Sequence, residues 1–191
     1  MSEGRIFYVI GASGSGKDSL LRHAREQLSG HRGIVFAHRY ITRPHDAGGE
    51  NHIALSDAEF DARLASGLFA MHWSSHGLRY GIGKEINLWL AKGCSVVLNG
   101  SREYLGRALL NYHELTPVLV EVAPDILKQR LQARGRETPE EIEQRLSHAP
   151  VIHGLNRHLA ITSICNDADI ATAGRELVEL LLAGQEQKAC A

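Results

Sequence analysis

The 191-residue chain lacks several features that mark whole classes of protein. Its only cysteines are Cys94, Cys165 and Cys190, an odd number without the spacing of metal ligands. This argues against a disulfide-bonded scaffold and indicates buried or unreactive thiols in a reducing compartment. No apolar run is long enough to span a membrane, and the short one near the N-terminus leads straight into a glycine-rich segment. We therefore expect no signal peptide, no membrane partner and a cytoplasmic location.

The chain also lacks an excess of charge of either sign. With 21 Lys and Arg against 22 Asp and Glu, its formal net charge is −1. A chain without a global basic field does not attract nucleic acid or an anionic membrane, so any positive charge that matters to function must be local. The histidines include His72 and His76 at helical i, i+4 spacing, but no carboxylate completes a zinc ligand set there. Trp73 and Trp89 lack interleaved basic residues, which favours the core or a pocket wall over base stacking.

What the chain does contain is a regular alternation of strand and helix patterns. Apolar runs rich in β-branched residues predict strands, and the amphipathic or capped segments between them predict helices. The expected strands are 5–10, 34–37, 95–98, 118–122 and 160–164, and the expected helices begin near 18, 56, 84, 124, 138 and 170. Two of these helices start with a capping box, Ser56 with Glu59 and Thr138 with Glu141.

This order of elements predicts an α/β fold with about five parallel strands in a sheet covered by helices on both faces. Residues 38–55 are expected to form a long loop, and residues 68–83 an irregular or β-like stretch. No internal repeat, low-complexity tract or linker interrupts the pattern, so residues 1–191 are expected to form a single domain.

The most specific signal is a glycine-rich segment between the first expected strand and the first expected helix. Glycines leave the backbone free of Cβ, so successive N–H groups can turn inward around a polyphosphate at the start of a helix. A lysine at this place adds a point charge on the β- and γ-phosphates. We therefore predict that the phosphates of ATP are bound by Gly11, Ala12, Ser13, Gly14, Ser15, Gly16, Lys17, Asp18 and Ser19, with Lys17 also acting in catalysis.

Further motifs carry a family resemblance that covers nearly the whole chain. Thr42-Arg43, followed by Gly49-Glu50, resembles the acceptor-binding segment of the guanylate kinase family. Tyr80-Gly81 resembles that family's tyrosine-glycine step, and Asn166-Asp167 its asparagine before the last helix. This resemblance implies a P-loop kinase fold, with residues 38–83 as an acceptor-binding region and residues 130–150 as a lid.

Two departures from that pattern disfavour GMP as the acceptor. Asp46 stands where these kinases usually carry a second arginine, and Ile82 stands where they carry Ser or Thr. A carboxylate would repel a phosphate held nearby, and an apolar side chain cannot donate a hydrogen bond to a base edge.

The chain instead resembles the ribose 1,5-bisphosphate phosphokinases. The resemblance rests on residues 14–19, 38–43, 50–56 and 97–102. It implies transfer of a phosphoryl group from ATP to ribose 1,5-bisphosphate, giving 5-phosphoribosyl 1-diphosphate during phosphonate breakdown. The alternatives are a guanylate kinase, converting GMP to GDP, and a kinase-shaped binding module without turnover. The implied partner is a small phosphorylated sugar, and the sequence carries no signal for oligomeric state.

The magnesium site is expected to differ from that of most P-loop enzymes. These usually ligate Mg²⁺ with a Ser or Thr after the lysine and support its water shell with an Asp at the end of a neighbouring strand. Here the first position is Asp18 and the second is Asn99, so the carboxylate has changed places. One hypothesis is that Asp18 provides the anionic oxygen near Mg²⁺ and Asn99 a neutral acceptor. The alternative is that Asp18 caps the helix and Ser19 serves the metal.

Arginines are expected to hold the acceptor, because a dianion approaching ATP needs convergent cations and the guanidinium fork suits phosphate oxygens. Arg43 is the leading candidate, with Arg39 as a helper, Tyr80 as a hydroxyl donor and Asn99 near the acceptor. Arg79 and Arg102 are weaker candidates. Glu50 either accepts hydrogen bonds from sugar hydroxyls or orients Arg43.

The same resemblance implies a closing lid that carries Arg134 and Arg145 as catalytic residues, with Arg136 beside them and Gly135 as a hinge. An alternative from the same residues is a solvated helix face in which these arginines pair with Glu137, Glu140 and Glu141. Arg130 is expected to contact either adenine or the helix surface.

Overall fold

The computed structural model describes residues 4–47, 50–135, 138–147 and 161–189, apart from the side chains of Arg134, Arg145, Ser147 and 185–189. A parallel sheet forms its centre, with the strand order β2-β7-β1-β8-β9. These strands are β1 (Ile6–Gly11), β2 (Ile34–Phe36), β7 (Ser95–Asn99), β8 (Leu115–Glu121) and β9 (Thr162–Cys165). The expected strands and their number are therefore confirmed.

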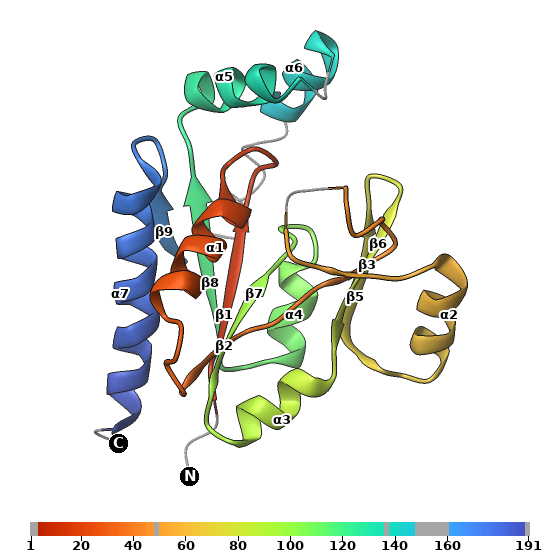
Figure 1. The fold of residues 1–191 in the computed structure, drawn as a ribbon, viewed down its shortest axis with the longest axis vertical. Helices are drawn as coiled ribbons and strands as arrows, with labels where there is room; N and C mark the ends of the chain where they lie inside the picture. Colours follow the sequence, from red (N-terminus) through yellow and green to blue (C-terminus); the bar gives the residue numbers. More distant parts are fainter. Residues whose placement is uncertain (1–3, 48–49, 136–137, 148–160, 190–191) are drawn as a thin grey trace.

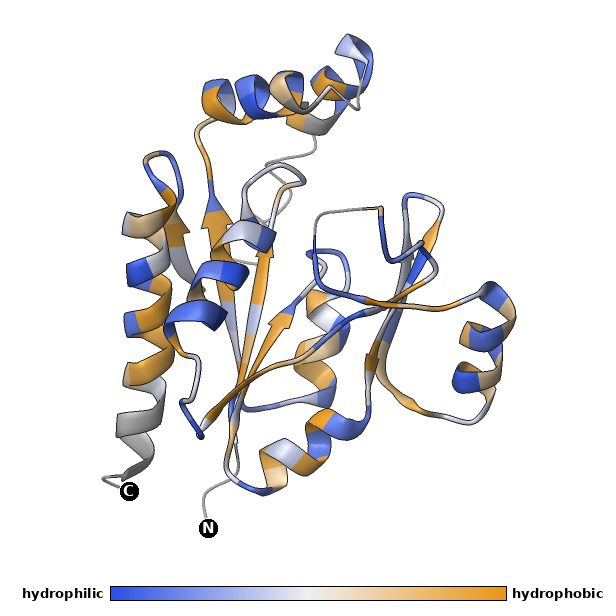
Figure 2. Cartoon of the chain, in the orientation of Figure 1, coloured by the Kyte–Doolittle hydropathy of each residue, from blue (hydrophilic) through white to orange (hydrophobic). Residues whose placement is uncertain are grey.

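Alternation along β1 explains why this sheet needs helices on both faces. Ile6, Tyr8 and Ile10 belong to one buried cluster, whereas Phe7 and Val9 belong to another. Because successive side chains of a strand point to opposite faces, an apolar residue at every position must be covered twice. Figure 2 shows the result, with the most hydrophobic segments gathered on the strands of this sheet.

Four helices flank the two faces of the sheet. The helices α1 (Lys17–Gln27) and α7 (Ile170–Ala189) bury Leu20 and Leu177 in the cluster that contains Phe7. The helices α3 (Glu85–Ala91) and α4 (Leu105–Asn111) bury Ile86 and Leu105 in the cluster that contains Tyr8. Figure 1 shows α1 and α7 to the left of the sheet and α3 and α4 to its right. No helix was expected from the sequence at the place of α4.

A second, four-stranded sheet stands beside the first, in the order β4-β3-β6-β5. The strands β5 (Phe69–Ser75) and β6 (Leu78–Gly83) form an antiparallel hairpin, so the stretch expected to be irregular or β-like is regular. The loop expected over 38–55 contains β3 (Tyr40–Ile41) and β4 (Ile53–Ala54), and that prediction was wrong at both places. The helix α2 (Asp57–Ala65) packs against this sheet through Phe60, which contacts Phe69 at a ring-centroid distance of 4.6 Å.

The hairpin contains His72 and His76, the two histidines whose i, i+4 spacing would suit a metal site on a helix. His72 lies in β5, and His76 lies in the turn with a positive φ of 50°, so they are not on one helical face. No group of three or more potential metal ligands occurs in the part of the chain that the structure describes. Trp73 stacks on Tyr80 and packs at a tilt against Tyr104, with 5.5 Å between ring centroids in each pair, which confirms a packing role.

Two further helices, α5 (Pro124–Arg134) and α6 (Pro139–Ser147), lie above the edge where the parallel strands end (Figure 1). The capping box predicted for α6 is complete: the Thr138 amide donates to Glu141 at 2.8 Å, and the Glu141 amide donates to the Thr138 hydroxyl at 3.3 Å. In α2 the Ser56 hydroxyl accepts from the Glu59 amide at 3.2 Å.

Neither described cysteine forms a disulfide. Cys94 is half-buried and Cys165 is exposed, so of the two only Cys94 fits the buried alternative; Cys190 lies outside the described residues. Among those residues no helix is both long enough and apolar enough to cross a lipid bilayer.

Candidate active site

The glycine-rich segment forms a tight turn between β1 and α1. Gly14 and Gly16 have φ values of +87° and +86°, in the left-handed region that glycine tolerates. Space also requires glycine here. A Cβ on Gly14 would lie 2.8 Å from a methyl carbon of Leu131, and a Cβ on Gly16 would lie 2.4 Å from Nδ2 of Asn166. The loop therefore takes the conformation expected of a phosphate-binding turn and is packed closely against α5 and the end of β9.

Lys17, the first residue of α1, folds back over this turn. Its ammonium donates to the carbonyl oxygens of Gly11 at 3.0 Å and Ala12 at 3.1 Å. Burial lowers the pKa of Lys17 from 10.5 to about 8; the carboxylate of Asp18 opposes this shift, and the charges of Arg39 and Arg102 add to it. The charged form is thus under-solvated, and a polyphosphate placed beside it would supply the missing counter-charge.

Asn166 fixes the outer side of the turn. It is buried at the end of β9, and its Nδ2 donates to the carbonyl oxygen of Ser15 at 2.7 Å. The next residue, Asp167, accepts from the amide of Ala123 at 2.7 Å, immediately before α5 begins. The sequence singled out this asparagine only by its resemblance to a family motif before the last helix. The structure shows that it ties the loop to the edge of the sheet where β9 lies.

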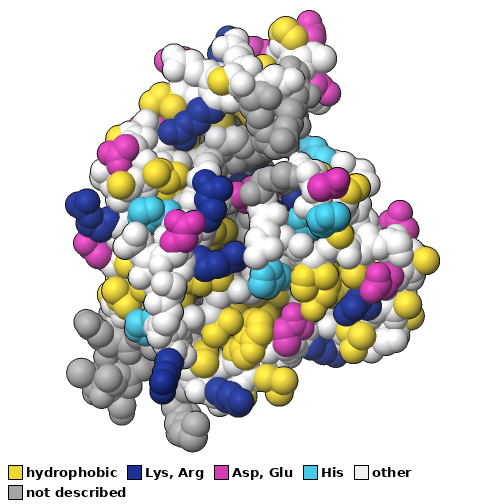
Figure 3. All heavy atoms as spheres, in the orientation of Figure 1, with side chains coloured by type: hydrophobic (Ala, Val, Ile, Leu, Met, Phe, Trp, Pro, Cys, Tyr) yellow, Lys and Arg dark blue, Asp and Glu magenta, His cyan; other side chains and the backbone are white. Residues whose placement is uncertain are grey.

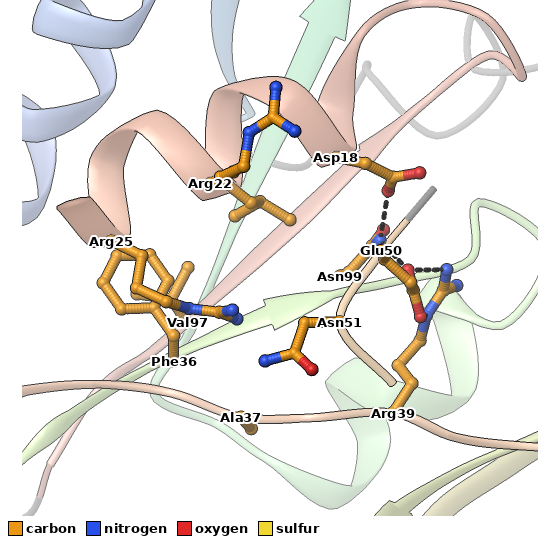
Figure 4. A pocket seen from close by; sticks show the side chains of 11 residues that line it. Asp18, Arg22, Arg25, Phe36, Ala37, Arg39, Glu50, Asn51, Val97 and Asn99 are labelled. Carbon is orange, nitrogen blue, oxygen red and sulfur yellow. Dashed lines mark hydrogen bonds and ion pairs between the residues drawn. The ribbon is translucent and has the colours of Figure 1, made fainter. Parts of the chain in front are cut away.

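A chain of hydrogen bonds crosses the site from α1 to the second sheet (Figure 4). Asn99, the last residue of β7, donates from Nδ2 to Asp18 at 2.7 Å and to Glu50 at 2.6 Å. Glu50 in turn accepts from Nε of Arg39 at 2.7 Å and forms a second ion-pair contact with its Nη2. Four predicted site residues therefore meet, although they are far apart in the sequence.

This meeting follows from the topology. The carboxyl ends of parallel strands lie at one edge of a sheet, so β1 with its loop and β7 with Asn99 deliver their last residues to the same place. Arg39 and Glu50 flank β3 and β4, which bring them to the facing side. Asp18, Arg39, Glu50 and Asn99 together line part of a cavity of about 70 Å³.

Asp18 has a partner outside its own helix. The N-cap residue of α1 is Gly16, which has no side chain with which to cap, and Asp18 is exposed in the first turn. The amide oxygen Oδ1 of Asn99 is buried and has no hydrogen-bond partner in the described part of the chain. Asn99 therefore faces Asp18 as a donor and not as the neutral acceptor that was expected, while the exposed Asp18 carboxylate, a ligand type that Mg²⁺ prefers, stands next to the phosphate-binding loop. The assignment of Mg²⁺ to Asp18 stays a prediction.

Tyr80 lies beneath Arg39. The guanidinium carbon of Arg39 is 5.0 Å from the centre of the Tyr80 ring, and Tyr80 stacks on Trp73 with an interplanar angle of 5°. The stack holds Arg39 from below while Glu50 holds it from the side. Arg39 is therefore more firmly positioned than a helper residue in a loop would be.

Arg43 lies apart from this network. Its Nη2 is 3.3 Å from Nδ1 of His52, and its Nε is buried without a partner in the described part of the chain. The suggestion that Glu50 orients Arg43 was wrong, because the Glu50 carboxylate pairs with Arg39. His52, only 8% exposed, was missed by the sequence analysis; its Nε2 lies 3.1 Å from the carbonyl oxygen of Arg43. The usable signal was its place two residues after Glu50, within the motif that carried the resemblance.

The remaining arginine candidates have different outcomes. Arg79 forms an ion pair with Asp61 at 2.6 Å and lies over the ring of Phe60, so it joins α2 to the second sheet. Arg102 is half-buried, and burial lowers its pKa. Arg134 ends α5 and Arg145 lies within α6, but their side chains, like all of Arg136 and Glu137, lie outside the described residues. Gly135 ends α5 in a left-handed conformation with φ 63°, as a hinge residue could.

Comparison with curated proteins gives the family. The chain is 62% identical over 181 residues to the ribose 1,5-bisphosphate phosphokinase of Thiobacillus denitrificans, covering 95% of this chain and 94% of that protein. It is 52% identical over 178 residues to the enzyme of the same name from Desulfomicrobium baculatum, covering 93% and 94%. The chain belongs to the ribose 1,5-bisphosphate phosphokinase family. The resemblance inferred from its motifs is confirmed.

The ribose 1,5-bisphosphate phosphokinase fold is shared with guanylate kinases. The crystal structure of guanylate kinase from Anaplasma phagocytophilum superposes with a TM-score of 0.68 at 19% identity, covering 96% of this chain and 87% of that one. At that identity the likeness concerns the fold alone, which confirms the expected guanylate kinase-like P-loop architecture. No family model matches the chain.

Proposed function

We propose that this chain transfers the γ-phosphoryl group of ATP to ribose 1,5-bisphosphate. An oxygen of the phosphate on C1 forms the new P–O bond while the bond between the β- and γ-phosphates of ATP breaks, giving 5-phosphoribosyl 1-diphosphate and ADP. The observation that carries the proposal is the 62% identity to a ribose 1,5-bisphosphate phosphokinase over nearly the whole chain. The resemblance on which this rests also implies a place in phosphonate breakdown.

The loop at Gly11–Ser19 is the proposed site for the ATP phosphates. Its left-handed glycines give the backbone the shape that turns N–H groups toward an anion, and the half-buried ammonium of Lys17 stands over the turn. Lys17 now shares its protons with two carbonyl oxygens, which are weaker partners than phosphate oxygens. Exchange of these partners for phosphate is the role that the geometry supports.

The acceptor chemistry requires no general base. A phosphate oxygen is already ionised at neutral pH, so the barrier comes from bringing two anions together. Cations and preorganised donors lower that barrier, and Arg39 is such a group, held by Glu50 and by the face of Tyr80. We assign Arg39 and Arg43 to acceptor phosphate, Tyr80 to a hydroxyl contact, and Glu50 with Asn99 to hydroxyl groups of the sugar.

Mg²⁺ is the proposed cofactor, held by Asp18 with Asn99 beside it. When bound there, it would supply positive charge that neutralises the phosphates of ATP. Arg134 and Arg145, on α5 and α6 above the loop, are proposed to close over the reacting phosphates as part of a lid at residues 130–150.

One observation separates this proposal from a guanylate kinase. Ile82, at the position where guanylate kinases usually carry Ser or Thr, is fully buried in the cluster that contains Tyr8 and Met71. It has no surface with which to contact a guanine base. The second alternative, a binding module without turnover, does not require the ammonium of Lys17 over the phosphate-binding turn.

The experiment is a coupled assay of ADP release with ribose 1,5-bisphosphate and GMP offered in parallel. We expect turnover with ribose 1,5-bisphosphate and at most a trace with GMP. A preference for GMP would make the chain a guanylate kinase, and no turnover with either acceptor would favour the binding module.

Lys17→Ala should abolish turnover while leaving the far-ultraviolet circular dichroism unchanged. The matched control is Lys92→Ala, since Lys92 is an exposed lysine after α3 and far from the site. Retained activity in Lys17→Ala would remove Lys17 from the reaction.

A further inference from the structure

The cavity at the active site continues beyond the groups assigned to the reaction. Its other walls include Arg22 and Arg25 from α1, Phe36 from β2, and Asn51 from the segment before β4. In Figure 4 the Arg25 side chain extends from α1 toward Asn51, whereas that of Arg22 extends toward the end of α1 that carries Asp18. Figure 3 shows Lys and Arg side chains gathered in the middle of the same face, beside a hollow between the two halves of the molecule.

The two arginines bring positive charge that the described residues do not neutralise. Neither Arg22 nor Arg25 forms an ion pair with any residue in the described part of the chain. They are three residues apart on α1, so their Cβ atoms lie about 5 to 6 Å apart and their charges repel each other. Arg25 is held over the ring of Phe36, with 5.6 Å from its guanidinium carbon to the ring centre. An anion between them would offset the repulsion.

The cavity is therefore polar along its length. Near the loop, Asn99 joins Asp18 to Glu50, and Arg39 offsets the charge of Glu50; Arg22 and Arg25 then add two positive charges along α1, and we call this part of the cavity its basic end. Asn51, which follows Glu50 directly, adds an amide to the basic end. A ligand that matches this pattern carries hydroxyl groups in its middle and a phosphate that points away from the loop.

We propose that Arg22, Arg25 and Asn51 bind the phosphate of the acceptor that does not react, the one on C5 of ribose 1,5-bisphosphate. This proposal rests on the proposed function, because only a bisphosphate brings a second phosphate to the site. The C1 phosphate then faces the Lys17 loop, the ribose hydroxyls face Glu50 and Asn99, and the C5 phosphate occupies the basic end. The arginine pair thereby selects a bisphosphate over a sugar with one phosphate.

The test compares acceptors with and without the second phosphate. Arg22→Gln and Arg25→Gln should each lower kcat/KM for ribose 1,5-bisphosphate by about 10- to 100-fold, the effect of one lost charge-assisted phosphate contact. The same variants should change kcat/KM for ribose 1-phosphate by less than about threefold, because this acceptor leaves the basic end empty. Arg22→Lys and Arg25→Lys should recover part of the loss.

A second measurement covers the case in which ribose 1-phosphate reacts too slowly to follow. Ribose 5-phosphate should inhibit competitively against the bisphosphate, and its Ki should rise by about 10- to 100-fold in the Gln variants. The control is Arg175→Gln on the exposed face of α7, which should leave both constants unchanged.

Each outcome decides the proposal. Equal losses with both acceptors would mean that the arginines act on the fold, and an unchanged preference for the bisphosphate would mean that its second phosphate binds elsewhere. Either result would overturn the proposal while leaving the kinase function intact. Absence of turnover in the unmodified enzyme would overturn the proposed function and, with it, the phosphate site.

Discussion

Binding of ATP should be accompanied by uptake of a proton at Lys17 when the pH is near or above 8. Burial holds the pKa of this ammonium at about 8 in the unliganded protein, and triphosphate oxygens beside it would restore the charged form. At pH 8.5 about three-quarters of the free protein carries a neutral Lys17, so binding should take up about 0.8 proton; at pH 7.0 the uptake should be about 0.1.

Isothermal titration calorimetry measures this directly, because the observed enthalpy changes with the ionisation enthalpy of the buffer in proportion to the protons taken up. A non-hydrolysable ATP analogue with Mg²⁺ avoids turnover, and its own phosphates are fully ionised at pH 8.5. Lys17→Met removes the titrating group, so the difference between the two proteins isolates Lys17. Equal uptake by both proteins at pH 8.5 would refute the assignment.

The lowered pKa of Lys17 also determines how the affinity for ATP and the stability of the fold depend on pH. Above pH 8 the affinity for ATP should fall about tenfold per pH unit until the pH approaches the pKa of Lys17 in the complex. Stability of the unliganded fold has the opposite slope. Between about pH 8 and 10.5 the unfolded chain binds more protons than the folded one, so the Lys17 contribution to the free energy of unfolding rises with pH.

Three further substitutions test the packing around the site. Gly14→Ala should lower the free energy of unfolding in urea by at least about 1 to 2 kcal/mol, because the residue is left-handed and its new Cβ would press on Leu131; an unchanged midpoint would contradict this. Asn99→Asp should lower the melting temperature more at pH 8 than at pH 5. The Asn99 amide now bridges the carboxylates of Asp18 and Glu50, and an ionised aspartate in its place would repel both. Equal effects at both pH values would show that the new group stays neutral. Tyr8→Phe should cost about 1 to 3 kcal/mol, since the Tyr8 hydroxyl accepts from the amide of Ser101 at 3.0 Å and donates to its carbonyl; a chemical-denaturation curve like that of the unmodified protein would oppose this.

The central sheet could be predicted because its strands are buried on both faces. Runs such as Ser95–Leu98 are apolar at nearly every position, and this pattern belongs to parallel strands under two layers of helices. The second sheet carries a weaker pattern, since β3 and β4 have two residues each, too short for any period to be detected. Its hairpin turns at His76-Gly77, both left-handed, where a sequence more typical of such turns would begin with Asn or Asp.

The active site, too, could be predicted from the sequence only in part. Local motifs predicted the phosphate-binding loop, because its glycines, its lysine and the flanking strand and helix are contiguous. The partner of Glu50 could not be predicted, since Arg39 and Arg43 are both within reach along the chain and only the placement of β3 and β4 selects Arg39. A signal for Arg22 and Arg25 was present, as residues three apart share one side of a helix, but nothing in the sequence showed that this side faces a cavity.

The side-chain amide of Asn99 links the two halves of the active site. Its nitrogen donates both to Asp18, proposed for the metal of the nucleotide, and to Glu50, proposed for the sugar, so a ligand that draws away either carboxylate would change the hydrogen bond to the other. We expect occupancy of one half of the site to change affinity in the other half, and by the same factor in both directions. The binding of the two substrates would then be coupled through a single planar group.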